Sequence, residues 1–138
     1  MTEKHHLLTN QEFEDKFKDC TLNLVLFTHE AHLRLSYIYI EKYGLDIAIK
    51  NLCEQIAQFD QKFGDGTKFN KTVTIASAQI LYHFINKSKA SNFRAFLNEF
   101  PVLKNDFLGL LKSHYTLDIF NNKKAKQEYL EPDLLRFG

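Results

Sequence analysis

The sequence has no tryptophan and few residues that interrupt helices, with five glycines and two prolines among its 138 residues. So few helix breakers favour long helices joined by short loops. The chain also lacks the alternation of apolar and polar residues that marks the strands of a half-buried sheet. We therefore predict an all-α fold: a single-domain helical bundle over residues 1–138, with three long helices and about four shorter ones, mostly antiparallel.

Cysteine is equally scarce. Cys20 and Cys53 lie far apart, and neither belongs to a CxxC pair. A disulfide between them is the alternative, but free thiols of a reducing compartment are the preferred interpretation. No apolar run near the N-terminus precedes a small-residue cleavage site, and charges interrupt every apolar stretch well before 18 residues. We expect a cytoplasmic protein with no signal peptide and no membrane span.

No strong charge imbalance is present, because 18 basic and 17 acidic residues leave a formal net charge of +1. This balance indicates neither a nucleic-acid partner nor an anionic membrane. The basic cluster of Lys123, Lys124 and Lys126 is typical of a solvated helix face. The sequence contains no glycine-rich phosphate loop and no GxSxG elbow, so no common enzyme motif indicates a reaction.

Phenylalanine is the residue type in excess, with 13 Phe and 6 Tyr. Aromatic rings bury large areas, so we expect an aromatic-rich core. The same excess leaves an alternative to ligand binding open. An aromatic face that a small bundle cannot hide would suit a structural or interaction module without enzymatic activity, such as a homodimer.

Apolar residues repeat at helical spacing along most of the chain, and residues that favour helix ends bound the repeats. Thr9 or Asn10 can cap the first helix, Gly44 can end the second, and Asn70 can cap the fourth. The predicted helices cover residues 10–19, 22–43, 45–63, 71–89, 91–100, 102–115 and 117–131.

Two histidines stand near the middle of the apolar run 22–43. His29 and His32 are three residues apart, so their side chains can share a helix face and could reach one divalent metal ion. The spacing is neither the HExxH of zinc hydrolases nor the Glu-x-x-His of di-iron bundles. The alternative is that both rings hydrogen-bond within the bundle.

Charged residues occupy the same run. Glu30 and Arg34 stand four apart in the order that favours an ion pair. The surrounding residues are so apolar that we expect Arg34 to have little solvent around it, and it could instead point into a cleft and bind an anionic group. A general-base role for His29 or His32 is the least favoured hypothesis, because Glu30 points about 100° away from His29 and does not orient it. We expect His5 and His6 to lie in a frayed terminus, outside any site.

Three motifs resemble those of an uncharacterised family of small bacterial helical proteins, over about residues 27–134. The first, F-x-H-x-A-H-L-R-x-A-[WY], is matched by Phe27, His29, Ala31, His32, Leu33, Arg34 and Tyr37. The last is an E-P-D-L ending, at residues 131–134. Between them the family carries Y-H-E-T-x-T, which is replaced here by Phe69, Asn70, Lys71 and Thr72.

The resemblance implies a pocket between the second and fourth helices. In the family pattern a third histidine could complete a metal site with the first two. Here Asn70 stands in its place, which disfavours a divalent metal because an amide is a poor transition-metal ligand beside imidazole. We therefore predict a polar pocket for a small molecule. The residues expected to line it are His29, His32, Arg34, Asn70 and Thr72.

Overall fold

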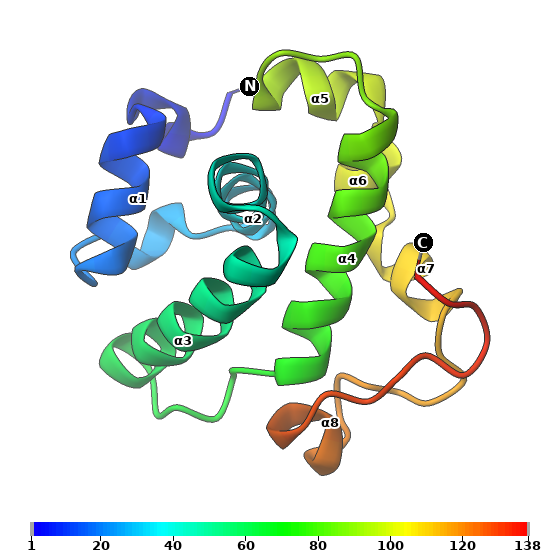
Figure 1. Ribbon diagram of the computed structural model, residues 1–138. Coiled ribbons are helices and arrows are strands. Elements are labelled where there is room, and N and C mark those ends of the chain that lie inside the picture. The colour runs from blue at the N-terminus through cyan, green and yellow to red at the C-terminus, as the bar shows by residue number, and fades with distance from the viewer. Residues whose placement is uncertain (1, 138) are drawn as a thin grey trace. The chain divides into compact units, whose positions relative to one another are not determined.

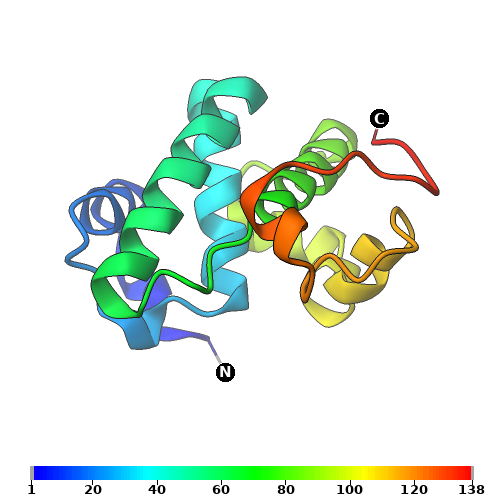
Figure 2. The ribbon, with the colours of Figure 1, turned by 90° about the horizontal axis from the view of Figure 1, so that it is seen from below.

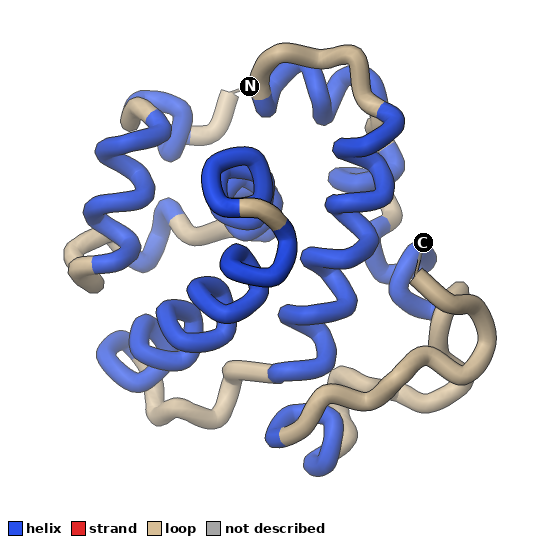
Figure 3. The backbone as a smooth tube through the Cα atoms, viewed as in Figure 1, coloured by secondary structure: helices blue, strands red, loops and turns tan. Residues whose placement is uncertain are grey.

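The computed structural model describes residues 2–137, and in that range every regular element is a helix (Figure 3). This confirms the predicted all-α class. The chain divides into two compact units, Met1–Phe69 and Asn70–Gly138. One domain over the whole chain stays a prediction, since compactness alone does not show whether a unit folds by itself. No helix of residues 2–137 combines the length and apolarity needed to span a lipid bilayer.

The first unit is built around the helix α2 (Figure 1). In chain order its elements are the 3-10 helix η1 (Lys4–Leu7), α1 (Asn10–Lys18), the 3-10 helix η2 (Leu24–Leu26), α2 (His29–Tyr43) and α3 (Leu45–Phe63). Both α1 and α3 pack against α2. The chain turns sharply after α2, so that α3 runs back beside it (Figure 2).

A single glycine joins these two long helices. The Gly44 backbone has φ +82° and ψ 165°, a conformation that a residue with a Cβ adopts only with strain. Its N–H donates to Ile40 O at 2.9 Å, and its carbonyl accepts from Ala48 N at 3.0 Å. Gly44 therefore ends α2 and begins α3, which confirms the predicted boundary.

The predicted start of that helix at residue 22 was wrong, because α2 begins only at His29. Two short polar side chains divide the apolar run. Asn23 Oδ1 accepts from Val25 N at 3.0 Å, which begins η2, and Thr28 Oγ1 accepts from Ala31 N at 3.2 Å, which caps α2. Such side chains offer the backbone a local bond in place of a continued helix.

The core of the first unit is aromatic, as the phenylalanine excess predicts. Phe17 is fully buried and stacks on Phe59, with ring centroids 4.9 Å apart. Phe27, just before α2, lies 4.7 Å from Phe17 and 5.1 Å from Phe59. These rings join α1, the start of α2 and α3 in one cluster.

The second unit is built around one long helix, α4. Its elements are α4 (Lys71–Lys87), α5 (Phe93–Glu99), α6 (Val102–Asn105), α7 (Phe107–Lys112) and α8 (Lys123–Gln127). Both α7 and α8 pack against α4. The described residues thus hold three long α-helices, as predicted, and five short ones.

Two predicted helices of this unit are shorter than expected. The range 102–115 is divided at Asp106, whose Oδ1 accepts from Gly109 N at 3.1 Å and so begins α7 as a separate helix. The range 117–131 is helical only over Lys123–Gln127, where Asn122 Oδ1 accepts from Ala125 N. In both places a side-chain cap placed within the apolar pattern decides where the helix begins.

Candidate functional site

The residues before α1, called here the N-terminal segment (residues 3–9), are bound to α2 by Arg34. This side chain is buried, as expected, with 5% of the residue exposed. Its Nη1 donates to His5 O at 2.6 Å and its Nη2 to Leu8 O at 2.8 Å, while Nη2 also donates to Asn10 Oδ1 at 3.0 Å. The guanidinium carbon lies 4.8 Å from the centre of the Phe13 ring. Arg34 therefore binds the chain's own backbone.

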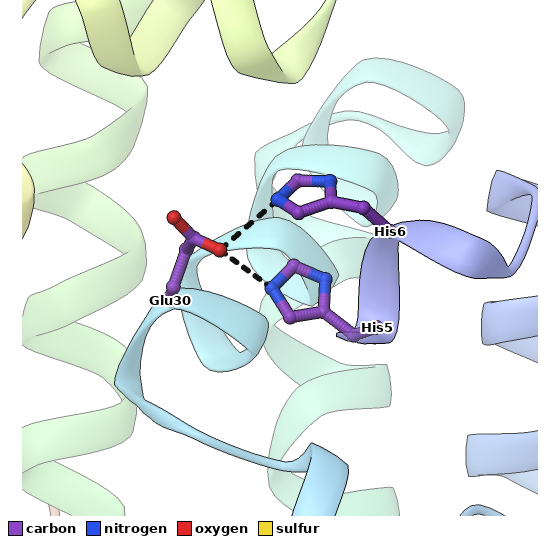
Figure 4. A group of neighbouring side chains, drawn as sticks. All are labelled: His5, His6 and Glu30. Carbon is purple, nitrogen blue, oxygen red and sulfur yellow. Dashed lines mark hydrogen bonds and ion pairs between the residues drawn. The ribbon is translucent and has the colours of Figure 1, made fainter. Parts of the chain in front are cut away.

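Two histidines and one carboxylate converge where this segment meets α2 (Figure 4). His5 Nε2 lies 2.7 Å and His6 Nε2 lies 3.0 Å from the same oxygen, Glu30 Oε2. The expectation that both histidines lie in a frayed terminus was wrong. They belong to η1, and only 1% of His5 and 7% of Glu30 is exposed.

The hydrogen bonds around His5 indicate its protonation state. Arg34 Nη1 lies 3.3 Å from His5 Nδ1 and can only donate, so Nδ1 accepts. The proton of the neutral ring is then on Nε2, which donates it to Glu30. Burial holds the pKa of His5 below its ordinary value, although the bond to Glu30 acts in the opposite direction. A neutral imidazole is the form that binds metal ions.

A second carboxylate lies at the edge of this cluster. Glu3 Oε1 is 3.5 Å from His5 Nε2 and accepts from Thr28 Oγ1 at 2.5 Å. Thr28 is the N-cap of α2, two residues before Glu30. The first turn of α2 therefore orients both carboxylates.

The two histidines predicted to bind metal lie elsewhere on α2. His29 is its first residue and is exposed. The His32 ring stacks on Phe27, with centroids 3.7 Å apart, and desolvation lowers its pKa to about 4. Among the described residues, the metal-ligating side chains that converge are those of His5, His6 and Glu30.

Asn70 and Thr72 belong to the second unit and bind its C-terminal part. Asn70 caps α4 by accepting from Val73 N at 3.0 Å, as predicted, and its Nδ2 donates to Ile119 O at 2.8 Å. Thr72 Oγ1 donates to Glu128 O at 2.7 Å and accepts from Leu130 N at 3.1 Å. The pocket predicted to join these residues to His29, His32 and Arg34 spans both units and stays a prediction.

The converging atoms of the cluster suit a small, borderline-soft cation. Imidazole nitrogen and carboxylate oxygen are typical ligands of zinc and its neighbours, whereas Ca²⁺ and Mg²⁺ prefer oxygen alone. All three ligand atoms lie within 4.8 Å of one another. The same atoms also form a satisfied hydrogen-bonded cluster when no ion is bound.

No protein-family model, curated protein or solved structure matches this chain.

Proposed function

We propose that this protein binds one divalent transition-metal ion of the zinc type through His5, His6 and Glu30. The observation that supports the proposal is the convergence of two imidazole Nε2 atoms on one carboxylate oxygen, at 2.7 Å and 3.0 Å. Two histidines and one carboxylate are a ligand set that zinc sites use.

Two of the three separations between ligand atoms are already close to those around a bound ion. Ligand atoms 2.0–2.2 Å from a tetrahedral zinc ion are about 3.3 Å from one another. The two histidine nitrogens therefore have to move away from Glu30 Oε2 by roughly half an ångström. In return, the ion takes the place of the proton that each ring now donates to that oxygen.

Binding requires a tautomer shift in His5, because Nε2 has to offer a lone pair and its proton then moves to Nδ1. A proton on Nδ1 faces Arg34 Nη1, so the hydrogen bond that the guanidinium donates to this nitrogen is lost. The Arg34 guanidinium also repels a second cation at this distance. Both effects lower the affinity. The affinity also falls as the solution becomes more acidic, because protons then compete with the ion for the imidazole nitrogens.

Titration of zinc into the metal-free protein tests the proposal, with calorimetry to give affinity and native mass spectrometry to give stoichiometry. The protein is prepared without a histidine tag, which would itself bind zinc. We expect one ion per chain. The variants His6→Ala and Glu30→Gln should each bind zinc at least tenfold more weakly, since even losing an indirect partner of a metal ligand costs about 10–100-fold.

The matched control is the double variant His29→Ala/His32→Ala, which removes the histidine pair that the sequence alone favours. It should bind zinc as tightly as the unaltered protein. Loss of binding in this control, with binding kept in His6→Ala, would assign the ion to the other pair and overturn the proposal. Absence of zinc binding by the unaltered protein would overturn it as well.

A further inference from the structure

We infer that Glu3 is the fourth ligand of this ion, so that the centre is closed and structural rather than open and catalytic. The inference rests on the metal binding proposed above. It concerns the coordination number of the ion and the role that follows from it.

The position of Glu3 supports this assignment. Its Oε1 already lies 3.5 Å from His5 Nε2, which is close to the separation of about 3.3 Å between two ligands of a tetrahedral zinc ion. The side chain of Glu3 is 31% exposed, so it stands on the solvent side of a cluster whose His5 and Glu30 side chains are 0% and 8% exposed. Glu3 does not belong to the group of ligand atoms that lie within 4.8 Å of one another, so its carboxylate has to turn toward His6 and Glu30 when the ion enters.

Thr28 orients this carboxylate. Its hydroxyl donates to Glu3 Oε1 at 2.5 Å while accepting from Ala31 N, so the N-cap of α2 also holds Glu3 over the cluster. A partner of this kind fixes a ligand's orientation at many metal sites.

Charge also favours a second carboxylate. A divalent ion bound by Glu30 alone would keep one positive charge, next to the positive charge of Arg34. Because Glu3 neutralises the remaining charge of the ion, the repulsion from the guanidinium decreases.

The ligand set determines what the ion does. Zinc with four protein ligands has no position for water or substrate, whereas catalytic zinc keeps one open. Glu3, His5 and His6 come from one short segment and Glu30 from α2, so the ion joins the N-terminal segment to the helix. Closing a loop of this kind stabilises the fold chiefly by constraining the unfolded chain.

Cobalt(II) in place of zinc tests the coordination number, because its visible absorption is intense with four ligands and changes when a new ligand enters. We expect the unaltered protein with bound cobalt to show a spectrum that excess azide leaves unchanged. In Glu3→Gln the position is open, so azide should alter the spectrum, and zinc affinity should fall about tenfold or more. The control Glu41→Gln changes an exposed glutamate of α2 and should behave as the unaltered protein.

The outcomes separate this inference from the proposed function. A cobalt spectrum of the unaltered protein that responds to azide would overturn the inference and leave metal binding intact. Equal zinc affinities of Glu3→Gln and the unaltered protein would do the same. Absence of cobalt and zinc binding by the unaltered protein would overturn both proposals. The azide experiment uses the unaltered chain, so it does not depend on how a variant folds.

Discussion

Arg34 shows how one residue can hold a segment that has little regular structure of its own. The guanidinium is buried and planar, and its donors match the carbonyls of His5 and Leu8 and the side chain of Asn10. Buried carbonyls need such partners, because each one left without a hydrogen bond costs about 1–3 kcal/mol. Arg34 thereby places the histidines of η1 beside Glu30.

We predict that Arg34→Met lowers the free energy of unfolding by about 2–4 kcal/mol, since several buried acceptors lose their donor at once. Arg34→Lys should recover only part of this loss, because an ammonium group cannot bridge the same acceptors. Urea denaturation followed by circular dichroism measures both. The control Lys50→Met removes an exposed cation from α3 and should change little. Equal stabilities of Arg34→Met and the control would contradict the anchoring role.

The sequence predicts the environment of Arg34 but not its partners. An arginine inside an apolar helix indicates burial, and the structure confirms this. Its partners lie 24–29 residues earlier in the chain, beyond the reach of helical spacing. His5 and His6 were missed for the same reason, since Glu30 is 25 and 24 residues away from them. The signal in the sequence that points to this cluster is the adjacent pair of histidines.

At the scale of helices, a boundary can be predicted from the sequence where a capping side chain or a glycine sets it. Thr9 accepts from Glu12 N at 3.1 Å, and Glu12 Oε1 accepts from Thr9 N, in the capping box that the sequence favours. Gly44 and Asn70 are also where the sequence predicts them. The starts of α2 and α7 were missed because Thr28 and Asp106 lie within continuous apolar patterns, where periodicity alone suggests an uninterrupted helix.

The pairing of α1 with the end of α2 depends on a buried carboxylate. Glu14 on α1 is 1% exposed and accepts from Tyr43 Oη at 2.5 Å and from Lys42 Nζ at 3.0 Å. Burial raises the pKa of Glu14, but the bonds from Tyr43 and Lys42 outweigh it, so the pKa lies below its ordinary value of 4.5. The folded state therefore favours the ionised carboxylate.

The sign of the pH dependence follows from this shift. The contribution of Glu14 is fully present above its ordinary pKa of 4.5 and is lost as the pH falls through the lower pKa of the folded state. We predict that Glu14→Gln is about 1–3 kcal/mol less stable than the unaltered protein at neutral pH. The difference should shrink as the pH falls below 4.5 and through the lower pKa of the folded state. Urea denaturation at several pH values measures it. A difference that stays constant with pH would contradict the prediction, and Glu41→Gln is the exposed control.

At the scale of the whole molecule, the division into Met1–Phe69 and Asn70–Gly138 leaves each unit small. A chain of about 60 residues buries only about 60% of its unfolded surface, so such a domain has marginal stability. Natural domains of this size often depend on a metal or a disulfide. Cys20 lies after α1 and Cys53 lies in α3, and the two form no disulfide with each other in the part of the chain that the structure describes. The proposed ion in the first unit would supply such a link.

The isolated fragment 1–69 tests whether the stability of this small unit depends on a bound metal ion. We predict that it folds, with a low melting temperature when free of metal, because its core and the whole ligand set lie within it. Free zinc at about 100 times the dissociation constant should stabilise it by about 2.7 kcal/mol, which corresponds to about 10 °C or more for a domain of this size. Thermal unfolding followed by circular dichroism measures the shift.

Fragment 70–138 carries none of the proposed ligands, so zinc should leave its melting curve unchanged. If fragment 1–69 stays unfolded with zinc and without it, the two units depend on each other, and the single domain predicted from chain length is the correct description.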